Sequence, residues 1–479
     1  MKTSSLKPGL TGPAQRSHRV KGKAILAAAV SIGLLSWAGL ATAQDSTPSL
    51  EEMWKIIQQQ QTEIERLKGQ NEALRQDVAT KIVVPADSPS ESDQAEGQPQ
   101  GSSGGTRLDI YGAAMLDTGY TRDPGNPDWF DVMRPTKLPA FDGEYGEDGE
   151  FWMGVRQSRL GFKTFTPTQL GELKTIFEFE LFGVGADAGQ TAFRLRHAWG
   201  ELGQFGAGQT WSVFMDPDVF PNSLEYWGPN GMVFFRNVQA RWTPWSDGGS
   251  NFAIALERPG ASGDQGSYAD RVELANIKGN FPLPDLTAHF RWAQDWGHVQ
   301  AAGILRRIEW DDLNDTDQYD FSGGATGWGI NLSTNVNLGP HVFRGSVVYG
   351  EGVQNYMNDA PVDIGIKNTF GNPARPIEGT ALPLLGIVAF LDLNWSEKWT
   401  STVGYSYLDI DNSDGQAPNA FRKGQYGLVN ILYHPVPNLF FGPEIQYGKR
   451  NNYTDGFSSD NLRLQFSVKY NFGTSFGEN

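Results

Sequence analysis

Apolar and polar residues alternate without a break near the end of the chain. From residue 462 to residue 472 every second residue is apolar, namely Leu462, Leu464, Phe466, Val468, Tyr470 and Phe472. Period two predicts a β-strand with Phe466 and Val468 on one face and Gln465 and Ser467 on the other. Eleven residues at roughly 3.3 Å per residue span about 35 Å, which is enough for a tilted strand to cross a bilayer.

The same alternation recurs at residues 173–181, 328–336 and 385–395. Strands of soluble β-sandwiches also alternate, but they are typically ~5 to 6 residues long. The greater length, together with Tyr, Trp and Phe at the strand ends, favours an all-β fold, a transmembrane antiparallel β-barrel.

Counting these segments predicts sixteen strands, and an even number is expected of a single-chain bacterial barrel. We place them at residues 107–121, 151–165, 170–182, 192–202, 206–213, 234–243, 250–258, 285–294, 297–311, 326–338, 341–353, 384–395, 398–411, 425–434, 438–450 and 461–472. The connections alternate between short turns and long loops. Residues 271–280 leave an alternative, because one more strand pair there would make eighteen.

The N-terminus indicates export. Residues 1–23 carry six Lys and Arg and no acid, an apolar run follows over residues 24–40, and Ala41-Thr42-Ala43 ends it. This order is typical of a signal peptide cleaved after residue 43, with an uncleaved membrane anchor as the alternative. Losing six positive charges takes the formal net charge from −16 to −22.

Residues 44–84 contain a heptad repeat. Its a positions are Leu50, Ile57, Ile64, Asn71 and Val78, and its d positions are Met53, Gln60, Leu67 and Leu74. The repeat predicts a short self-associating coiled coil, and the alternative is a lone amphipathic helix packed on the barrel. Residues 85–106 are rich in Pro, Ser, Gly and Gln and predict a flexible linker to a barrel at residues 107–479.

Composition narrows the function. The negative charge argues against a nucleic-acid partner, and the absence of Cys excludes disulfides, thiolate metal sites and Cys nucleophiles. We find no hydrolase, metalloprotease or P-loop motif, and we expect no enzyme activity, no cofactor and no bound metal. The acids Asp311, Asp312, Asp315, Asp317 and Asp320, and the stretch 409–415, suggest calcium loops, but solvated turns explain them better.

Several short motifs resemble the DcaP-type porins, which are trimeric outer-membrane channels. The residues that carry the resemblance are Gln157-Ser158-Arg159-Leu160-Gly161-Phe162, Gly171-Glu172, Arg196-His197-Ala198-Trp199-Gly200, Gly208-Gln209-Thr210-Trp211-Ser212, Gly350-Glu351-Gly352 and Tyr470-Asn471-Phe472. The resemblance covers residues 107–472 and implies a homotrimer in the outer membrane of a Gram-negative bacterium, with a periplasmic N-terminal helix. The chain departs from the usual barrel pattern by adding residues 473–479 after the final aromatic residue.

Strand parity predicts which side chains face the pore. If Phe193, Leu195 and Trp199 face lipid or a neighbouring subunit, the alternate residues point inward, and inward parity holds for Arg159, Arg194, Arg196, Arg241 and Arg306. Inward guanidinium groups select anions and bind carboxylates with two hydrogen bonds. An alternative is that these arginines pair with Glu172, Glu178 and Glu180 in a wall network, and both descriptions can hold together.

The long loop at residues 214–233 is the candidate constriction. In porins the third loop folds into the barrel, and this one carries Asp216, Asp218 and Glu225. We expect these acids to lie opposite the arginines and to set up a transverse field that orients dipolar solutes.

The sequence therefore predicts an outer-membrane porin that admits small hydrophilic solutes by passive diffusion and favours anions such as dicarboxylates. The alternatives are an unselective or cation-preferring porin, which the net charge suggests, and a structural tether in which the barrel anchors the coiled coil. The transported solute does not follow from the sequence.

A peptide of residues 48–80 tests the coiled-coil prediction. If Ile57, Ile64, Leu67 and Leu74 pack in a helical bundle, the peptide self-associates in sedimentation equilibrium and is helical by circular dichroism. A peptide that is helical yet monomeric at high concentration would count against the bundle, although tethering to barrels raises the effective concentration of the helices.

Overall fold

The computed structural model describes residues 105–146, 148–314 and 318–477. The predicted signal peptide, the coiled coil and most of the predicted linker lie outside these residues. Within them, no helix is long and apolar enough to cross a membrane.

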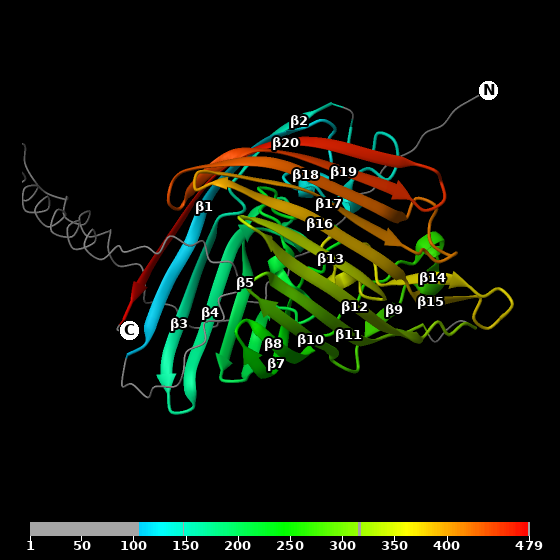
Figure 1. Ribbon diagram of the computed structural model, residues 1–479. Coiled ribbons are helices and arrows are strands. Elements are labelled where there is room, and N and C mark those ends of the chain that lie inside the picture. The colour runs from blue at the N-terminus through cyan, green and yellow to red at the C-terminus, as the bar shows by residue number, and fades with distance from the viewer. Residues whose placement is uncertain (1–104, 147, 315–317, 478–479) are drawn as a thin grey trace, which may run out of the picture. The chain divides into compact units, whose positions relative to one another are not determined.

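Twenty strands and seven short 3-10 helices make up the described part of the chain (Figure 1). The strands of the first half are β1 (Arg107–Thr121), β2 (Glu150–Gly154), β3 (Arg159–Thr168), β4 (Gly171–Phe182), β5 (Thr191–Leu202), β6 (Phe205–Trp211), β7 (Arg236–Asp247), β8 (Ser250–Glu257), β9 (Ile277–Asn280) and β10 (Asp285–Gln294). Those of the second half are β11 (Gly297–Asp312), β12 (Gly323–Leu338), β13 (His341–Glu351), β14 (Ile364–Asn368), β15 (Ile377–Ala381), β16 (Pro383–Ser396), β17 (Trp399–Ile410), β18 (Phe421–Val436), β19 (Leu439–Asn452) and β20 (Ser458–Phe476).

The 3-10 helices all lie in the long connections. They are η1 (Pro127–Trp129), η2 (Pro135–Lys137), η3 (Gly185–Asp187), η4 (Pro217–Val219), η5 (Gly266–Tyr268), η6 (Val272–Leu274) and η7 (Gln354–Tyr356).

The described strands form a closed antiparallel barrel of sixteen, which confirms the predicted number. Strands β2 and β3 pair with successive parts of β1 and together fill one position in the barrel wall. Strands β9 and β10 do the same along β11, so the segment 271–280 extends a neighbouring strand and adds no pair to the wall. The hairpin β14–β15 pairs only with itself within the sheets of the described residues.

Strand β20 closes the barrel against β1. The pairing runs from Thr121 with Arg463 to Leu108 with Phe476. The residues after the final predicted aromatic position, Gly473 to Phe476, therefore continue the ladder and satisfy backbone groups of β1 that would otherwise form an open edge. Short turns join the strands at one end of the barrel, and the longer loops gather at the other, which in outer-membrane barrels is the extracellular end.

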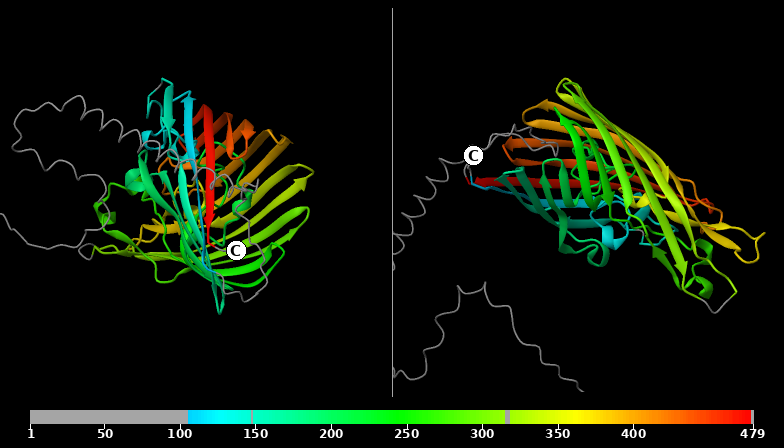
Figure 2. Two further views of the ribbon diagram at one scale, coloured as in Figure 1. Left: turned by 90° about the vertical axis from the view of Figure 1, so that its left-hand side faces the viewer. Right: turned by 90° about the horizontal axis from the view of Figure 1, so that it is seen from below.

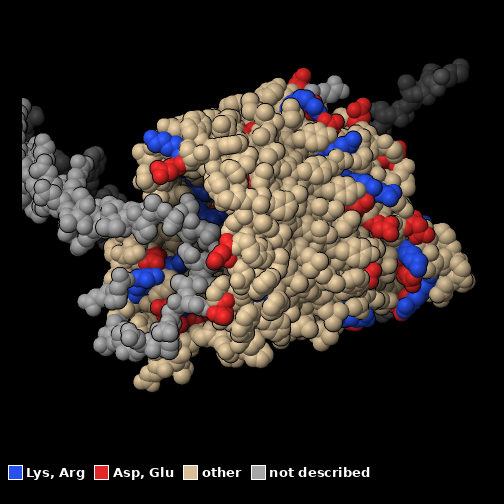
Figure 3. All heavy atoms as spheres, in the orientation of Figure 1, with Lys and Arg blue, Asp and Glu red and all other residues tan. Residues whose placement is uncertain are grey.

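The barrel is apolar outside and polar inside. On β12 the side chains of Ile330 and Leu332 are exposed, whereas Asn331 and Ser333 between them are buried. The predicted parity of β20 is confirmed, with Phe466 exposed and Gln465 and Ser467 buried. In Figure 3 the charged side chains gather toward the ends of the barrel, and the band between them carries few, as a lipid-facing surface requires.

Long loops occupy part of the barrel interior. The largest cluster of buried apolar side chains joins residues of the inner wall, such as Ile304 and Val348, to loop residues including Met133, Phe214 and Tyr356. Figure 2 shows the curved sheet of strands from two further directions. The wall residues of this apolar cluster come from β11, β13, β16, β17 and β18.

A charge placed on the outer face tests the orientation of β20. Val468→Lys puts an ammonium group on the lipid side and costs about 2 to 4 kcal/mol if the position is near the bilayer midplane. We expect a loss of folded, heat-modifiable protein from outer-membrane fractions. The matched control is Lys469→Glu, which replaces one charged side chain by another at the next residue, on the inner face of the strand. This variant should assemble normally. Equal losses from both changes would contradict the orientation.

Candidate functional site

The third loop (residues 212–235) leaves the wall after β6 and enters the barrel. Asp216 is fully buried, and its carboxylate accepts hydrogen bonds from His298 Nε2 at 2.8 Å and from Ser333 Oγ at 2.6 Å. Arg291 on β10 pairs with both Asp216, at 3.3 Å, and Asp218. Burial alone would raise the pKa of Asp216, but His298, Arg291 and Ser333 lower it to about 2. Asp216 is therefore an ionised anchor that fixes the start of the loop to the wall.

Two more carboxylates hold the tip of the loop. Glu225 accepts hydrogen bonds from the backbone N–H groups of Met133, Trp227 and Gly228 and from the Tyr426 hydroxyl. Burial raises the pKa of Glu225 to about 7, against the lowering effect of the backbone donors. Glu444 on β19 accepts from the N–H groups of Leu224, at 2.7 Å, and Glu225, at 3.0 Å. These bonds satisfy backbone donors that would otherwise be buried without partners.

The opposite wall carries a cluster of arginines. Glu178 and Glu180 on β4 are buried, and four guanidinium groups on the same part of the wall surround them: Arg159 of β3, Arg194 and Arg196 of β5, and Arg236 of β7. Arg196 donates to both carboxylates and is almost fully buried. Arg159 and Arg194 keep 29% and 27% of their side-chain surface exposed and are less buried than Arg196 and Arg236.

The first loop (residues 122–149) adds a fifth arginine. The guanidinium carbon of Arg134 lies 4.1 Å from the ring centre of Trp129 and 4.1 Å from that of Trp227 in the third loop. Asp359, in the connection between β13 and β14, accepts from Arg134 Nε at 2.8 Å. Cation–π contacts and the ion pair thus fix Arg134 where the three connections meet.

These elements enclose a polar pocket of about 340 Å³. Its lining includes Arg134, Arg194 and Arg236 together with Tyr226, Trp227 and Asn358. The Nη1 atom of Arg236 is buried and has no hydrogen-bond partner among the described residues. Within the described residues, guanidinium groups outnumber the carboxylates that they pair with in this cluster, Glu178, Glu180 and Asp359, so the pocket and the wall beside it suit an anion.

The five arginines that were predicted to line the pore lie in three different places. Arg159, Arg194 and Arg196 come together as parity predicts, and they pair with Glu178 and Glu180 as in the wall-network alternative. Arg306 is enclosed by Asp285, Asp363 and the carbonyl groups of Gly260 and Gly352, out of reach of a solute. Arg241 lies on the inner face of β7 and donates to the carbonyl of Trp211.

Two expectations differ from the structure. The acids of the third loop contact Arg291, His298 and Tyr426 and not the arginines named from the sequence. Trp199 does not face outward: it is buried, and the guanidinium of Arg241 lies 5.1 Å from its ring centre. The reason is an irregularity in the pairing of β5 with β4 between the partners of Glu178 and Phe179, which shifts the parity of β5 beyond Arg196.

The sequence did not point to Arg134, Arg236 or Arg291. Arg134 lies in a loop, where no periodicity assigns a direction. Arg236 and Arg291 are on strands, and Arg291 alternates with the exposed Phe290 and Trp292, which is a parity signal that would have identified it.

One group of side chains has the spacing of a metal site. Asp216, Asp218 and His298 place one ligand atom each within 4.8 Å of one another. Arg291 already donates to both carboxylates, and its charge takes the place of a cation. Of the two acidic stretches, Asp409 pairs with Lys423 at 3.0 Å, and Asp312 accepts from backbone N–H groups of its own loop, which fits ordinary turns.

Comparison with known proteins agrees with this architecture. The family model of the DcaP outer membrane protein matches residues 35–374. The outer-membrane channel DcaP of Acinetobacter baumannii shares the fold, with a TM-score of 0.62 and 20% identity over 78% of this chain and 99% of that chain. The anion-selective porin from Comamonas acidovorans aligns with a TM-score of 0.47 and 11% identity over 77% of this chain and 100% of its own.

No curated protein matches the chain. The family model covers well over half of the 479 residues, and the channel that shares the fold is a barrel of the same kind. These proteins are channels and not enzymes. The chain therefore belongs to the DcaP outer membrane protein family, and its sixteen-stranded barrel is that of an outer-membrane porin.

Proposed function

We propose that this porin admits small hydrophilic solutes by passive diffusion and favours anions, dicarboxylates among them. The observation that carries the proposal is the excess of guanidinium groups around the polar pocket, which is lined by wall strands and by residues of the first and third loops. A charge in a confined, partly dehydrated bore acts more strongly than the same charge at the surface.

Arg159 and Arg194 are the residues that we propose a solute meets first. Both remain partly exposed, and both lie at the edge of the cluster, whereas Arg196 and Arg236 are buried behind them. A carboxylate that leaves one guanidinium therefore finds the next within the same cluster, and no single arginine holds it alone.

The acidic net charge does not oppose an anion preference. In the orientation of Figure 3 the acids lie toward the ends of the barrel, and the acids of the third loop are paired or hydrogen-bonded. Charge at the ends acts on solutes through solvent, where salt screens it within about 8 Å at physiological ionic strength. The charges that line the bore decide the selectivity.

The assembly follows as part of the same proposal. A signal peptide at residues 1–43 directs export, the barrels form a homotrimer in contact with outer-membrane lipid, and the coiled coil at residues 44–84 lies in the periplasm. If the protein acted mainly as a tether, deleting residues 44–106 would abolish that function, whether or not the barrel still conducts. We expect the deletion variant to conduct like the parent in planar bilayers.

Neutralising the two accessible arginines tests the anion preference. We expect Arg159→Gln with Arg194→Gln to shift the reversal potential in a salt gradient toward cations, because two positive charges leave the lumen. Glu178 and Glu180 keep Arg196 and Arg236 as partners, so the fold persists. The control is Arg122→Gln in the first loop, where Arg122 is half exposed and pairs with Asp123 and Asp460. An unchanged reversal potential in the double variant would show that Arg159 and Arg194 do not set the ion selectivity of the channel.

Solute uptake gives an independent readout of the same change. In liposome-swelling assays, the double variant should lose more uptake of dicarboxylates than of neutral sugars. The difference should shrink as salt rises, because the Debye length falls to about 3 Å at 1 M. Equal losses for both solutes would indicate a narrowed bore and no electrostatic selection.

A further inference from the structure

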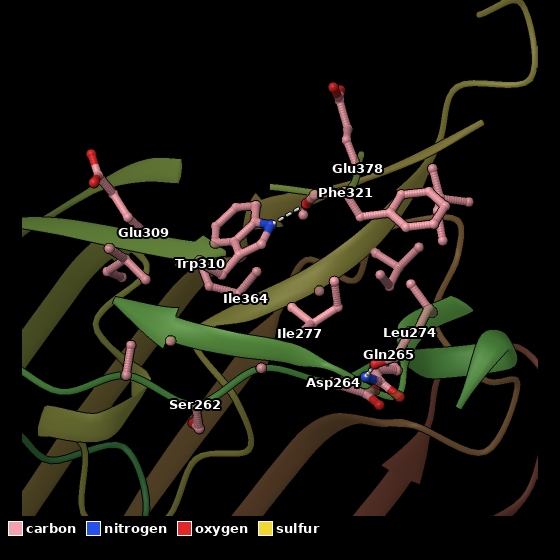
Figure 4. Close-up of a pocket in the computed structure, with 18 of the residues that line it drawn as sticks. Ser262, Asp264, Gln265, Leu274, Ile277, Glu309, Trp310, Phe321, Ile364 and Glu378 are labelled. Carbon is pink, nitrogen blue, oxygen red and sulfur yellow. Dashed lines mark hydrogen bonds between the residues drawn. The ribbon is translucent and has the colours of Figure 1, made fainter. Parts of the chain in front are cut away.

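A second pocket lies at the long-loop end of the barrel, and its Ser262 donates a hydrogen bond to Asn355, which lines the polar pocket. This second pocket has a volume of about 220 Å³ and lies between the loop at residues 258–276, strand β9, the end of β11 and the hairpin β14–β15 (Figure 4). Ile308 and Trp310 on β11 have the inward parity of the buried Ile304 and Arg306. The pocket is therefore on the lumen side, at the mouth of the channel.

The lining of this mouth pocket is mainly apolar. Aliphatic and aromatic side chains from these four segments and from the connections beside them converge on it: Leu274, Ile277, Phe281, Ile308, Trp310, Phe321, Ile364 and Ile377. Figure 4 shows Ile277 and Ile364 side by side beneath the indole ring of Trp310. Such a lining is unexpected in the water-filled mouth of a channel for hydrophilic solutes, because apolar surface is favourably removed from water.

The position of Trp310 is fixed by its surroundings. Its Nε1–H donates to the carbonyl of Phe321 at 2.8 Å, so the polar edge of the ring is already satisfied. Gly379 on β15 lies against the same ring, and a Cβ atom there would overlap the indole. A ring held in this way offers an immobile aromatic surface to a ligand. Because the side chain of Trp310 is already fixed, it loses little conformational entropy when the ligand binds.

Polar side chains around the mouth pocket are engaged elsewhere. Ser262 Oγ donates to Asn355 Oδ1 at 2.9 Å, Asp264 accepts from the N–H of Gly266 at 2.8 Å, and Gln265 Nε2 donates to the carbonyl of Leu274 at 2.8 Å. These groups do not call for a polar ligand, and a water molecule in the pocket would find few partners.

The two carboxylates at the rim do not define a cation site. Glu309 pairs with Arg307 at 2.7 Å, and Glu378 lies 3.8 Å from Lys367. In Figure 4 both carboxylates point away from the aliphatic lining. Neither charge is left over for a ligand, so the pocket favours a neutral group.

We propose that the mouth pocket binds the uncharged aromatic ring of a small amphipathic solute. An engineered cavity of about 150 Å³ lined by Leu, Ile and Phe binds benzene, so a pocket of 220 Å³ has room for one ring and its substituents. The ring packs against Trp310 and the isoleucines, and polar substituents point to the lumen. This site holds such solutes at the channel entrance, and it does not depend on the anion preference of the arginine cluster.

Binding of 4-fluorophenol to the full mature porin in lipid nanodiscs tests the proposal. The probe is uncharged at pH 7, since phenols ionise near pH 10. Its ¹⁹F resonance is followed during titration, and empty nanodiscs of the same lipid give the baseline for partitioning. We expect saturable binding to the parent protein above this baseline.

Two variants remove the site in opposite ways. Trp310→Ala removes the aromatic wall, and Ala261→Trp fills the space from the loop at residues 258–276. Each should weaken binding by about tenfold or more, which is a change of at least 1.4 kcal/mol. The reversal potential of Trp310→Ala should match that of the parent, which separates this proposal from the anion preference and shows that the barrel is intact.

The matched control is Phe370→Ala. Phe370 is an exposed aromatic residue in the connection between β14 and β15 and is not part of the pocket lining. This variant should bind the probe as the parent does. The proposal would be overturned if the parent protein showed no saturable binding of 4-fluorophenol above the empty-nanodisc baseline. Equal affinity of the parent and Trp310→Ala for the probe would also overturn it.

Discussion

Backbone pairing inside a bilayer is the constraint on which this structure depends. No water is available there to hydrogen-bond free N–H and C=O groups, so a sheet that crosses the membrane must close on itself. Here closure is the ladder between β1 and β20, which runs almost the full length of β1. The period-two pattern of the sequence follows, because each strand must present apolar residues to lipid and polar residues to the interior.

The polar interior also supplies the side chains that hold the loops in place. Buried carboxylates accept backbone N–H groups of the loops. Glu225 and Glu444 accept from the third loop, and Glu225 and Asp359 accept from the first loop. Each buried acid thereby satisfies donors that would otherwise lack partners. Several buried acids thus serve as loop anchors, and arginines gather on the wall from β3 to β7.

The sequence predicted the barrel well because period two is a local signal. All sixteen strand positions and the inward direction of Arg194 follow from it. It could not show that a pairing irregularity at Arg196 turns Trp199 inward, or that Arg306 is enclosed by Asp285 and Asp363, since both depend on neighbouring strands. The contribution of Arg134 depends on the path of the first loop. The signal peptide and the coiled coil remain predictions, since they lie outside the described residues.

The central claim is that the guanidinium groups along β3, β5 and β7, and not the acidic surface, set the charge preference of the channel. The most direct test is the zero-current potential of the unmodified porin in a planar bilayer with a tenfold gradient of potassium chloride at low salt. The account predicts a potential of the sign that chloride permeation produces, decreasing as both salt concentrations are raised. A potential of the sign that potassium permeation produces would contradict it.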